Sequence, residues 1–415
     1  MQTHLAPEFQ NTPDGREAEA ILRKCVHCGF CTATCPTYQL LGDELDGPRG
    51  RIYLIKQVLE GETPTRETQL HLDRCLTCRN CETTCPSGVQ YGHLVDIGRK
   101  IVEANVPRTP AERRLRGVLR AGLSSPLFGP AMRLGQAARN FLPPALRAKV
   151  PFRREAGAWP KGSHQRKVLM LEGCVQPSMA PGINRATARV LDAAGIQVLR
   201  PRAQGCCGAV RFHLNDQEGA RQQMRRNIDA WWPYIDSGRV EAIVMNASGC
   251  GAAVKEYAHV LKDDTRYASK AKRVSELTRD LSEMLPDIAP ALAGRISPPR
   301  EAVVFHPPCT LQHWQQLRGG VEQHMRALGF DLRPVPMESH LCCGSAGTYS
   351  VLQPELSTKL RDRKLGNLLG ERAADQPAAI ISANIGCITH LQSGTEVPVR
   401  HWVELLDEAM RPASG

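Results

Sequence analysis

Short apolar runs alternate with helical stretches in the C-terminal part of the chain. Four such runs, each of three or four apolar residues, lie at 168–171, 242–245, 302–305 and 379–381. A helical stretch at 186–194 follows the first run, and another helix ends near residue 329. Short apolar runs that alternate with helices predict strands of a parallel sheet. We therefore expect two α/β units, at residues 165–290 and 300–412.

The two units carry cysteines at matching places along the chain. Each has a single cysteine after its first apolar run, then a Cys-Cys-Gly triplet, then a last cysteine. The gaps are 31 and 32 residues from the first cysteine to the pair, and 42 and 43 residues from the pair to the last cysteine. Residues 274–277 (Val-Ser-Glu-Leu) are also echoed by residues 402–405 (Trp-Val-Glu-Leu). These matches predict an internal repeat.

Each single cysteine comes soon after a predicted strand. Sites in open α/β sheets collect at the carboxyl ends of strands, so we expect the four thiols of each unit to converge on one pocket that could hold a cluster or a metal. Four buried thiols without a metal are the alternative, because buried cysteine packs as a small hydrophobe. The first set is Cys174, Cys206, Cys207 and Cys250, and the second set is Cys309, Cys342, Cys343 and Cys387.

Two further groups of four cysteines lie before residue 90. Both read Cys-x2-Cys-x2-Cys-x3-Cys-Pro, the run of bacterial ferredoxins, in which the fourth cysteine ligates the other cluster of a pair. We therefore expect two [4Fe-4S] clusters with crossed ligation. Cluster 1 takes Cys25, Cys28, Cys31 and Cys85, and cluster 2 takes Cys75, Cys78, Cys81 and Cys35.

Structural zinc is the alternative for these runs, because paired Cys-x2-Cys units also build zinc ribbons. Zinc takes four ligands, whereas each run offers three closely spaced cysteines and a Cys-Pro, which favours iron–sulfur clusters. All eight ligand positions are filled by cysteine, so His27 is interpreted as a loop residue. Residues 51–60 are predicted to be strongly helical. With this helix, residues 1–107 resemble the helical type of ferredoxin domain found in respiratory dehydrogenases.

The basic charge of the chain is concentrated between its two cysteine-rich parts. The formal net charge is +11, and the segment 108–154 alone contains eleven Arg or Lys residues and a single Glu. We interpret residues 108–164 as a basic, proline-containing connector. It mixes arginines with apolar side chains, which suits an anionic membrane surface or an acidic face of a partner. A solvated linker is the alternative. Aromatic residues are few, at 5%, so a nucleic-acid partner is not expected.

The remaining composition narrows the class of protein. No stretch reaches the ~20 apolar residues that cross a bilayer, and the first residues lack the features of a signal peptide, so we expect a cytoplasmic chain. In a reducing compartment sixteen cysteines indicate metal or redox chemistry rather than disulfides. No Gly-x-Gly-x-x-Gly follows a strand and no Walker A loop occurs, so nothing marks a nucleotide site.

The two Cys-Cys-Gly units resemble the CCG, or cysteine-rich, domain of heterodisulfide reductases, over roughly residues 165–410. The resemblance implies an α+β multidomain protein in which a helical ferredoxin domain precedes two repeated α/β CCG units. The fullest family pattern has a fifth cysteine three residues after the last one. Ala253 and His390 occupy those positions here, and His390 could substitute as a ligand.

Flanking residues extend the resemblance to almost the whole chain. Residues 28–39, 47–51, 172–174, 247–251 and 341–348 are similar to the iron–sulfur subunits of bacterial glycolate oxidases. That resemblance implies FAD-binding partner subunits, oxidation of glycolate to glyoxylate at a flavin, and association with the cytoplasmic face of the inner membrane. The chain would then pass electrons from that flavin toward a quinone or another acceptor, with no catalytic residue of its own.

Three alternatives remain open. The chain could serve a flavin-linked dehydrogenase for glycerol 3-phosphate or lactate. It could be a heterodisulfide-reductase-like enzyme that uses its Cys-Cys-Gly sites, although the absent fifth cysteines count against this. It could also be a zinc or nucleic-acid protein without catalytic function. Metal analysis distinguishes iron with acid-labile sulfide from zinc.

Overall fold

The computed structural model describes residues 1–143, 147, 150–152, 155–370 and 376–410. Contacts within the chain divide it into two compact units. The first comprises Met1–Gly117 and His340–Lys364, and the second comprises Val118–Ser339 and Leu365–Gly415. The expected division into four parts is finer, and its boundaries stay a prediction. Of the connector, Lys149, Arg153 and Arg154 lie outside the described residues.

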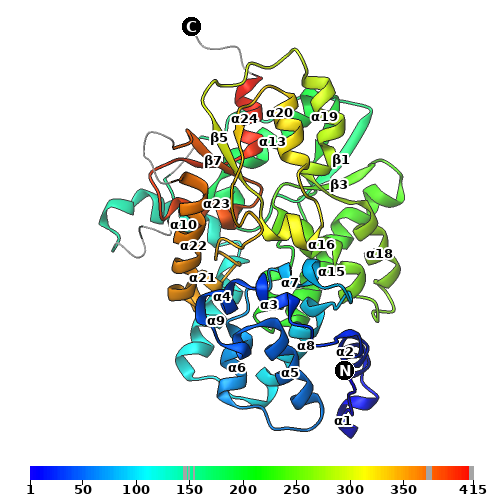
Figure 1. Cartoon of the computed structure of the whole chain (residues 1–415). Helices are drawn as coiled ribbons and strands as arrows, with labels where there is room; N and C mark the ends of the chain where they lie inside the picture. The colour runs from blue at the N-terminus through cyan, green and yellow to red at the C-terminus, as the bar shows by residue number, and fades with distance from the viewer. Residues whose placement is uncertain (144–146, 148–149, 153–154, 371–375, 411–415) are drawn as a thin grey trace. The chain divides into compact units, whose positions relative to one another are not determined.

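The first unit is built from helices, which run from blue to cyan in the N-terminal part of Figure 1. Helix α9 (Pro110–Leu123) continues from this unit into the second, and α22 (Pro354–Leu369) also belongs to both. The remaining helices are α1 (Pro7–Gln10), α2 (Pro13–Lys24), α3 (Phe30–Ala33), α4 (Pro36–Leu41), η1 (Glu44–Asp46), α5 (Pro48–Leu59), α6 (Arg66–Asp73), α7 (Asn80–Thr84), α8 (Tyr91–Asn105) and α21 (Tyr349–Leu352).

Local sequence fixes where these helices begin. Thr12 caps α2 by accepting a hydrogen bond from the Gly15 amide at 3.0 Å, and proline is the first residue of α2, α4 and α5. Thr65 and Thr68 form a reciprocal capping box at the start of α6. The helix predicted at 51–60 is therefore present as most of α5.

The hydrophobic core of this unit joins four helices. Leu22 of α2, Ile55 of α5, Leu72 of α6 and Leu94 of α8 are almost fully buried. Helices α2 and α6 end immediately before the first and second cysteine run, and Cys25, Cys75 and Cys81 belong to the same core. Packing of these helices therefore positions both cysteine runs.

The second unit contains two four-stranded parallel sheets, which confirms the predicted α/β units. In the first sheet the order is β2-β1-β3-β4, and Leu169 pairs with Ile243. In the second it is β6-β5-β7-β8, and Val304 pairs with Ile380. The strands are β1 (Arg166–Met170), β2 (Ile196–Leu199), β3 (Ala242–Met245), β4 (Thr278–Asp280), β5 (Val303–His306), β6 (Leu332–Arg333), β7 (Ala379–Ser382) and β8 (Val399–His401).

Helices connect these strands, as parallel pairing requires. Those of the first sheet are α12 (Gln176–Met179), α13 (Pro181–Ala193), α14 (Ala209–His213), α15 (Gln217–Asp236), α16 (Ser248–Lys255), α17 (Tyr257–Val260), α18 (Ala268–Leu277), η3 (Leu281–Met284) and α19 (Leu285–Leu292). Those of the second are η4 (Thr310–Trp314), α20 (Gly320–Ala327), α23 (Ile385–Gln392) and α24 (Trp402–Ala409). The connector forms α10 (Phe128–Ala137) and η2 (Arg139–Phe141).

One proposed match of the repeat is wrong. Residues 274–277 end α18 before strand β4, whereas residues 402–405 begin α24 after strand β8. The true counterparts are the residues that follow the strands. Asp280 with Glu283 and His401 with Glu404 form equivalent capping boxes at the ends of β4 and β8. The Glu-Leu pairs at 276–277 and 404–405 therefore lie in helices that are not equivalent in the repeat.

Candidate functional site

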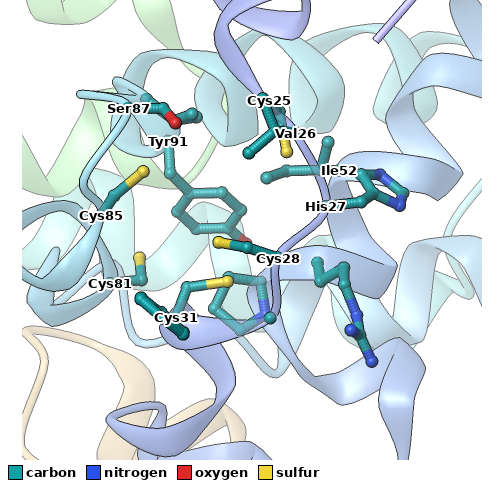
Figure 2. A pocket seen from close by; sticks show the side chains of 15 residues that line it. Cys25, Val26, His27, Cys28, Cys31, Ile52, Cys81, Cys85, Ser87 and Tyr91 are labelled. Carbon is teal, nitrogen blue, oxygen red and sulfur yellow. The ribbon is translucent and has the colours of Figure 1, made fainter.

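The first cysteine run and the last cysteine of the second run surround one cavity. Cys25, Cys28, Cys31 and Cys85 all line it. Figure 2 shows their sulfur atoms directed toward a common space, with Ile52 and Tyr91 beside them. Cys25 directly follows α2, Cys31 lies in α3, and Cys28 is exposed at the surface. This is the set expected for cluster 1.

A neighbouring cavity collects the complementary set. Cys35, Cys75, Cys78 and Cys81 line it, and all four are buried. Cys81 also lines the first cavity, so the two cavities are adjacent. The grouping is the one that crossed ligation requires, and the ligation itself stays a prediction.

The chemistry of these thiols fits an iron–sulfur cluster. Burial and neighbouring cysteines raise the pKa of Cys31 to about 11, and burial raises the pKa of Cys81 well above its usual value. Four thiolates crowded into a small space repel one another unless cations share them. Iron displaces the protons from coordinating thiols, so that the closely spaced thiolates become its ligands. Residues of both cavities therefore suit a [4Fe-4S] cluster.

The four cysteines of the first Cys-Cys-Gly unit come together. The thiols of Cys174, Cys206, Cys207 and Cys250 lie close enough to shift one another's pKa values. The neighbouring thiols lower the pKa of Cys206, and the neighbouring thiols together with burial raise the pKa values of Cys174 and Cys207. Cys174 follows β1, and Cys250 lies in the first turn of α16, just after β3. The set therefore gathers at the carboxyl ends of these strands, and a bound cluster or metal there stays a prediction.

Backbone contacts hold the vicinal pair of this set. The Asn227 side-chain amide donates to the Cys206 carbonyl oxygen at 2.9 Å, and the Tyr257 hydroxyl donates to the Cys207 carbonyl oxygen at 2.9 Å. Trp231 stacks on Tyr257, with ring centroids 6.5 Å apart. Buried groups from α15 and α17 therefore fix the two thiols in place.

The second set is divided between the two compact units. Cys342 and Cys343 belong to the first unit, whereas Cys309 and Cys387 belong to the second. Cys387 lies in the first turn of α23, and the Asn384 side-chain amide donates to its sulfur at 3.6 Å. Convergence of these four thiols stays a prediction.

The glycine of the second Cys-Cys-Gly triplet meets a tight backbone contact. Gly344 has φ +88°, and a Cβ atom there would lie 2.5 Å from the Ser357 carbonyl oxygen. The Ser357 hydroxyl in turn donates to the Gly344 carbonyl oxygen at 2.8 Å. The first triplet shows the same arrangement, because Gly208 has φ +94° and a Cβ atom there would lie 3.1 Å from the Ala220 carbonyl oxygen. Glycine is required in this motif because the backbone is left-handed and closely approached.

We expect Gly344→Ala to destabilise the protein by about 2–4 kcal/mol, the combined cost of left-handed backbone for alanine and of overpacking. Gly347→Ala is the matched control, since Gly347 has φ +63° with nothing within 4 Å. It should cost only about 1–2 kcal/mol. Equal shifts of the thermal midpoint in the two variants would contradict the close contact at Gly344.

The two positions of the absent fifth cysteine are both buried. Ala253 lies in α16 and packs in the core of the first sheet, with 8% of its surface exposed. His390 lies in α23 and is 7% exposed. Ala253 has no ligand atom, so a fifth ligand from this position is excluded in the first unit. Ligation by His390 stays a prediction.

The connector begins inside the first unit. Arg108, expected as its first basic residue, is 6% exposed and pairs with Asp73 at 2.7 Å and Glu103 at 2.6 Å. Arg116 also pairs with Asp73, at 3.1 Å. Two of the connector arginines therefore stabilise the helical unit rather than a partner surface.

Farther along, the connector exposes large apolar side chains. Val118, Leu127, Leu134 and Phe141 are 67%, 73%, 72% and 91% exposed. Among the described residues no helix combines the length and the apolar character needed to cross a membrane.

Comparison with known proteins agrees with the site. Residues 21–89 match the 4Fe-4S dicluster domain family, and residues 168–255 and 303–392 match the cysteine-rich domain family called CCG. Both matches contain the cysteines described above, so an iron–sulfur protein with [4Fe-4S] clusters is confirmed.

Similar proteins cover the whole chain. The chain is 55% identical to the glycolate oxidase iron–sulfur subunit of Escherichia coli (strain K12), over 99% of each chain. It is 30% identical to the probable glycolate oxidase iron–sulfur subunit of Bacillus subtilis (strain 168), over 97% of each. It is 29% identical to lactate utilization protein A 2 of Bacillus mycoides (strain KBAB4), over 58% of this chain and 98% of that protein. The chain belongs to the family of glycolate oxidase iron–sulfur subunits.

Proposed function

We propose that this chain carries single electrons from FAD in a partner subunit, reduced by glycolate, toward a quinone or another acceptor. One observation carries the proposal. Eight cysteines line two adjacent cavities, in a chain 55% identical over its full length to a glycolate oxidase iron–sulfur subunit.

The chemistry of the reaction calls for such a relay. Oxidation of glycolate to glyoxylate releases two electrons and two protons, and a flavin accepts them together as a hydride and a proton. Bound [4Fe-4S] clusters supply one-electron transfer. The cysteines of this chain hold the two sites next to each other, because Cys81 lines both cavities. Helices α2, α5, α6 and α8 pack in one core and keep that spacing fixed.

The proposal is tested by purifying the chain together with its native partner subunits and measuring iron, acid-labile sulfide and flavin. Anaerobic addition of glycolate should bleach the iron–sulfur absorbance. Lactate and glycerol 3-phosphate serve as competing substrates in the same measurement. Faster bleaching by either of these would assign the chain to another flavin-linked dehydrogenase.

Lactate is the second candidate, favoured by the similarity to lactate utilization protein A 2. That similarity is 29% and spans 58% of the chain, against 55% and 99% for the glycolate oxidase subunit. Of the two candidate substrates, glycolate is therefore the one that we propose for the complex.

We also propose that the connector rests on an anionic membrane surface, which would place the chain at the cytoplasmic face of the inner membrane. Helix α10 is anchored to α12, where the Gln136 side-chain amide donates to the Ser178 carbonyl oxygen at 3.1 Å. Leu127 and Leu134 nevertheless stay exposed, and so does Arg133. Apolar side chains beside arginines suit the boundary between acyl chains and anionic headgroups.

We expect the full chain to sediment with vesicles of phosphatidylcholine and phosphatidylglycerol. The double variant Leu127→Ser/Leu134→Ser should bind them at least about tenfold more weakly, because each leucine contributes about 1 kcal/mol or more on burial. Val351→Ser, at a 39% exposed valine outside the connector, is the control and should bind normally. Absence of binding, or equal binding by all three proteins, would favour the solvated linker.

A further inference from the structure

The two cysteine runs differ in charge at equivalent positions. Every cysteine of the second run lies 50 residues after its counterpart in the first. Between the second and third cysteines, the first run has Gly29, with φ +84°, and the second has Arg79, with φ +58°. Glycine adopts this left-handed backbone without strain, whereas arginine does not. The second run therefore keeps an arginine where the local backbone favours glycine.

The fold makes room for the side chain of Arg79. Arg79 is 7% exposed and lines the second cavity. A Cβ atom at Gly92, in α8, would lie 2.3 Å from its Nε atom, so any larger residue there would displace the guanidinium. A strained backbone and a glycine in a neighbouring helix together place one positive charge beside the second cluster site.

A second buried arginine lines the same cavity. Arg51 of α5 is 1% exposed and lines the cavity. Its guanidinium donates to the His71 carbonyl oxygen at 2.7 Å and to the Thr37 hydroxyl at 3.2 Å. The Thr37 hydroxyl is 3.3 Å from the sulfur of Cys35, a predicted ligand. Arg51 is therefore connected to the second site through one hydroxyl group.

A third buried arginine contacts the backbone of another predicted ligand. Arg99 of α8 is 8% exposed, and it donates to the Cys75 carbonyl oxygen at 2.6 Å and to the Thr77 hydroxyl at 3.0 Å. The Tyr91 hydroxyl donates to the sulfur of Cys75 at 3.6 Å. Positive charge and hydrogen bonds therefore converge on the second site from α5, from α8 and from the residue that precedes α7.

Nearby carboxylates offset part of this charge. Asp46 pairs with Arg51 at 3.4 Å and with Arg74 at 2.7 Å, and Glu82 lies 3.8 Å from Arg79. Asp96 lies one turn before Arg99 on α8 and is also buried. Arg51, Arg74, Arg79 and Arg99 thus supply four positive charges against the three negative charges of these carboxylates.

The first site has positive charge that is more exposed and better screened. Arg49 lines its cavity, but its side chain is 37% exposed and pairs with Glu44 at 2.6 Å. The amino group of Met1 donates to the Cys25 carbonyl oxygen at 2.7 Å. Exposure of Cys28 lets water and salt screen these groups.

Two effects set the order of the reduction potentials. An electron added to a cluster adds negative charge, which burial disfavours and neighbouring cations stabilise. Burial of Cys35, Cys75, Cys78 and Cys81 alone would lower the potential of the second site. Buried cations act there with little screening, so they oppose this effect strongly.

We propose that Arg51, Arg79 and Arg99 hold the reduction potential of cluster 2 above that of cluster 1. With both clusters bound, one electron would pass from the site of Cys25, Cys28, Cys31 and Cys85 to the neighbouring site, with no bond broken and no proton transferred. The inference rests on the proposed function for the source of that electron. The three arginines act only through their positive charge, which stabilises the added electron, and they do not touch a substrate.

The test is an EPR-monitored redox titration of the full chain with both clusters reconstituted, using a chemical reductant without glycolate or flavoprotein. In Arg79→Gly the higher of the two potentials should fall by at least about 59 mV, which is a tenfold change in the ratio of reduced to oxidised cluster. The lower potential should stay unchanged. Glycine suits the backbone at this position, so the variant should fold.

Arg49→Gln is the matched control and should leave the higher potential unchanged. If Arg79→Gly fails to retain iron, Arg51→Gln replaces it, since an amide can still donate to the His71 carbonyl oxygen. A fall in the lower potential, or no shift with both clusters intact, would overturn the inference and leave the proposed function standing. Absence of iron and sulfide in the wild-type chain would instead overturn the proposed function.

Discussion

Purified chain, loaded with iron and sulfide but free of flavoprotein, is expected to show no bleaching of its visible absorbance when glycolate is added anaerobically. Glycolate loses its electrons as a pair, and the two cysteine cavities offer one-electron sites. Essentially all glycolate-dependent reduction should therefore depend on the FAD-binding subunits. Stopped-flow absorbance with and without those subunits measures the difference.

Dithionite provides the control for this experiment, because it donates single electrons directly and should bleach the same sample. A complex that lacks the chain should still reduce its flavin with glycolate, as far as the flavoprotein assembles, but should lose transfer to the acceptor. Bleaching by glycolate of the chain alone would make this chain the catalyst and would contradict its role as a relay.

The cysteine spacing alone predicts which cysteines meet at each cavity of the helical unit. Cys25 and Cys85 are 60 residues apart in sequence, yet both line one cavity, as the ferredoxin run implies. Apolar runs likewise predict both parallel sheets, because a strand buried on two faces reads as a continuous apolar stretch. These features depend on local spacing and on hydrophobic pattern, which a single sequence records directly.

The charge around the second cluster site is not apparent from the same patterns. Arg51 and Arg99 read as the polar residues of amphipathic helices. Only tertiary packing brings Arg51 to the cavity and Arg99 to the Cys75 carbonyl oxygen. Arg79 alone leaves a signal in the sequence, since it replaces the glycine of the first run. A comparison of the two runs position by position could have identified it.

The position of the second Cys-Cys-Gly pair is another feature that the repeat does not predict. Tyr349, which follows this pair, is 6% exposed and donates to the Arg74 carbonyl oxygen at 3.0 Å. The Asn80 side-chain amide donates to the His340 carbonyl oxygen at 3.4 Å. Residues 340–364 thus pack within the helical unit, because side-chain contacts far apart in sequence outweigh the symmetry of the repeat.

Replacement of Cys85 by serine is expected to remove cluster 1 rather than cluster 2. Cys85 belongs to the second run, but it lines the cavity of Cys25, Cys28 and Cys31. Serine is a poor ligand for iron, so iron and acid-labile sulfide bound at the two ferredoxin-type sites should fall to about half. Cys35→Ser should produce the same loss at the other cavity, which Cys35 shares with Cys75.

The identity of the surviving cluster distinguishes crossed from uncrossed ligation. With crossed ligation, the EPR spectrum and reduction potential of Cys85→Ser match those of Cys25→Ser. With uncrossed ligation, they match those of Cys75→Ser instead. Ser87→Ala controls for a change in the cavity wall, because Ser87 lines the same cavity without a sulfur atom and should retain both clusters. A match between Cys85→Ser and Cys75→Ser would show that each run closes its own cluster, and the shared lining by Cys81 would then provide the route between them.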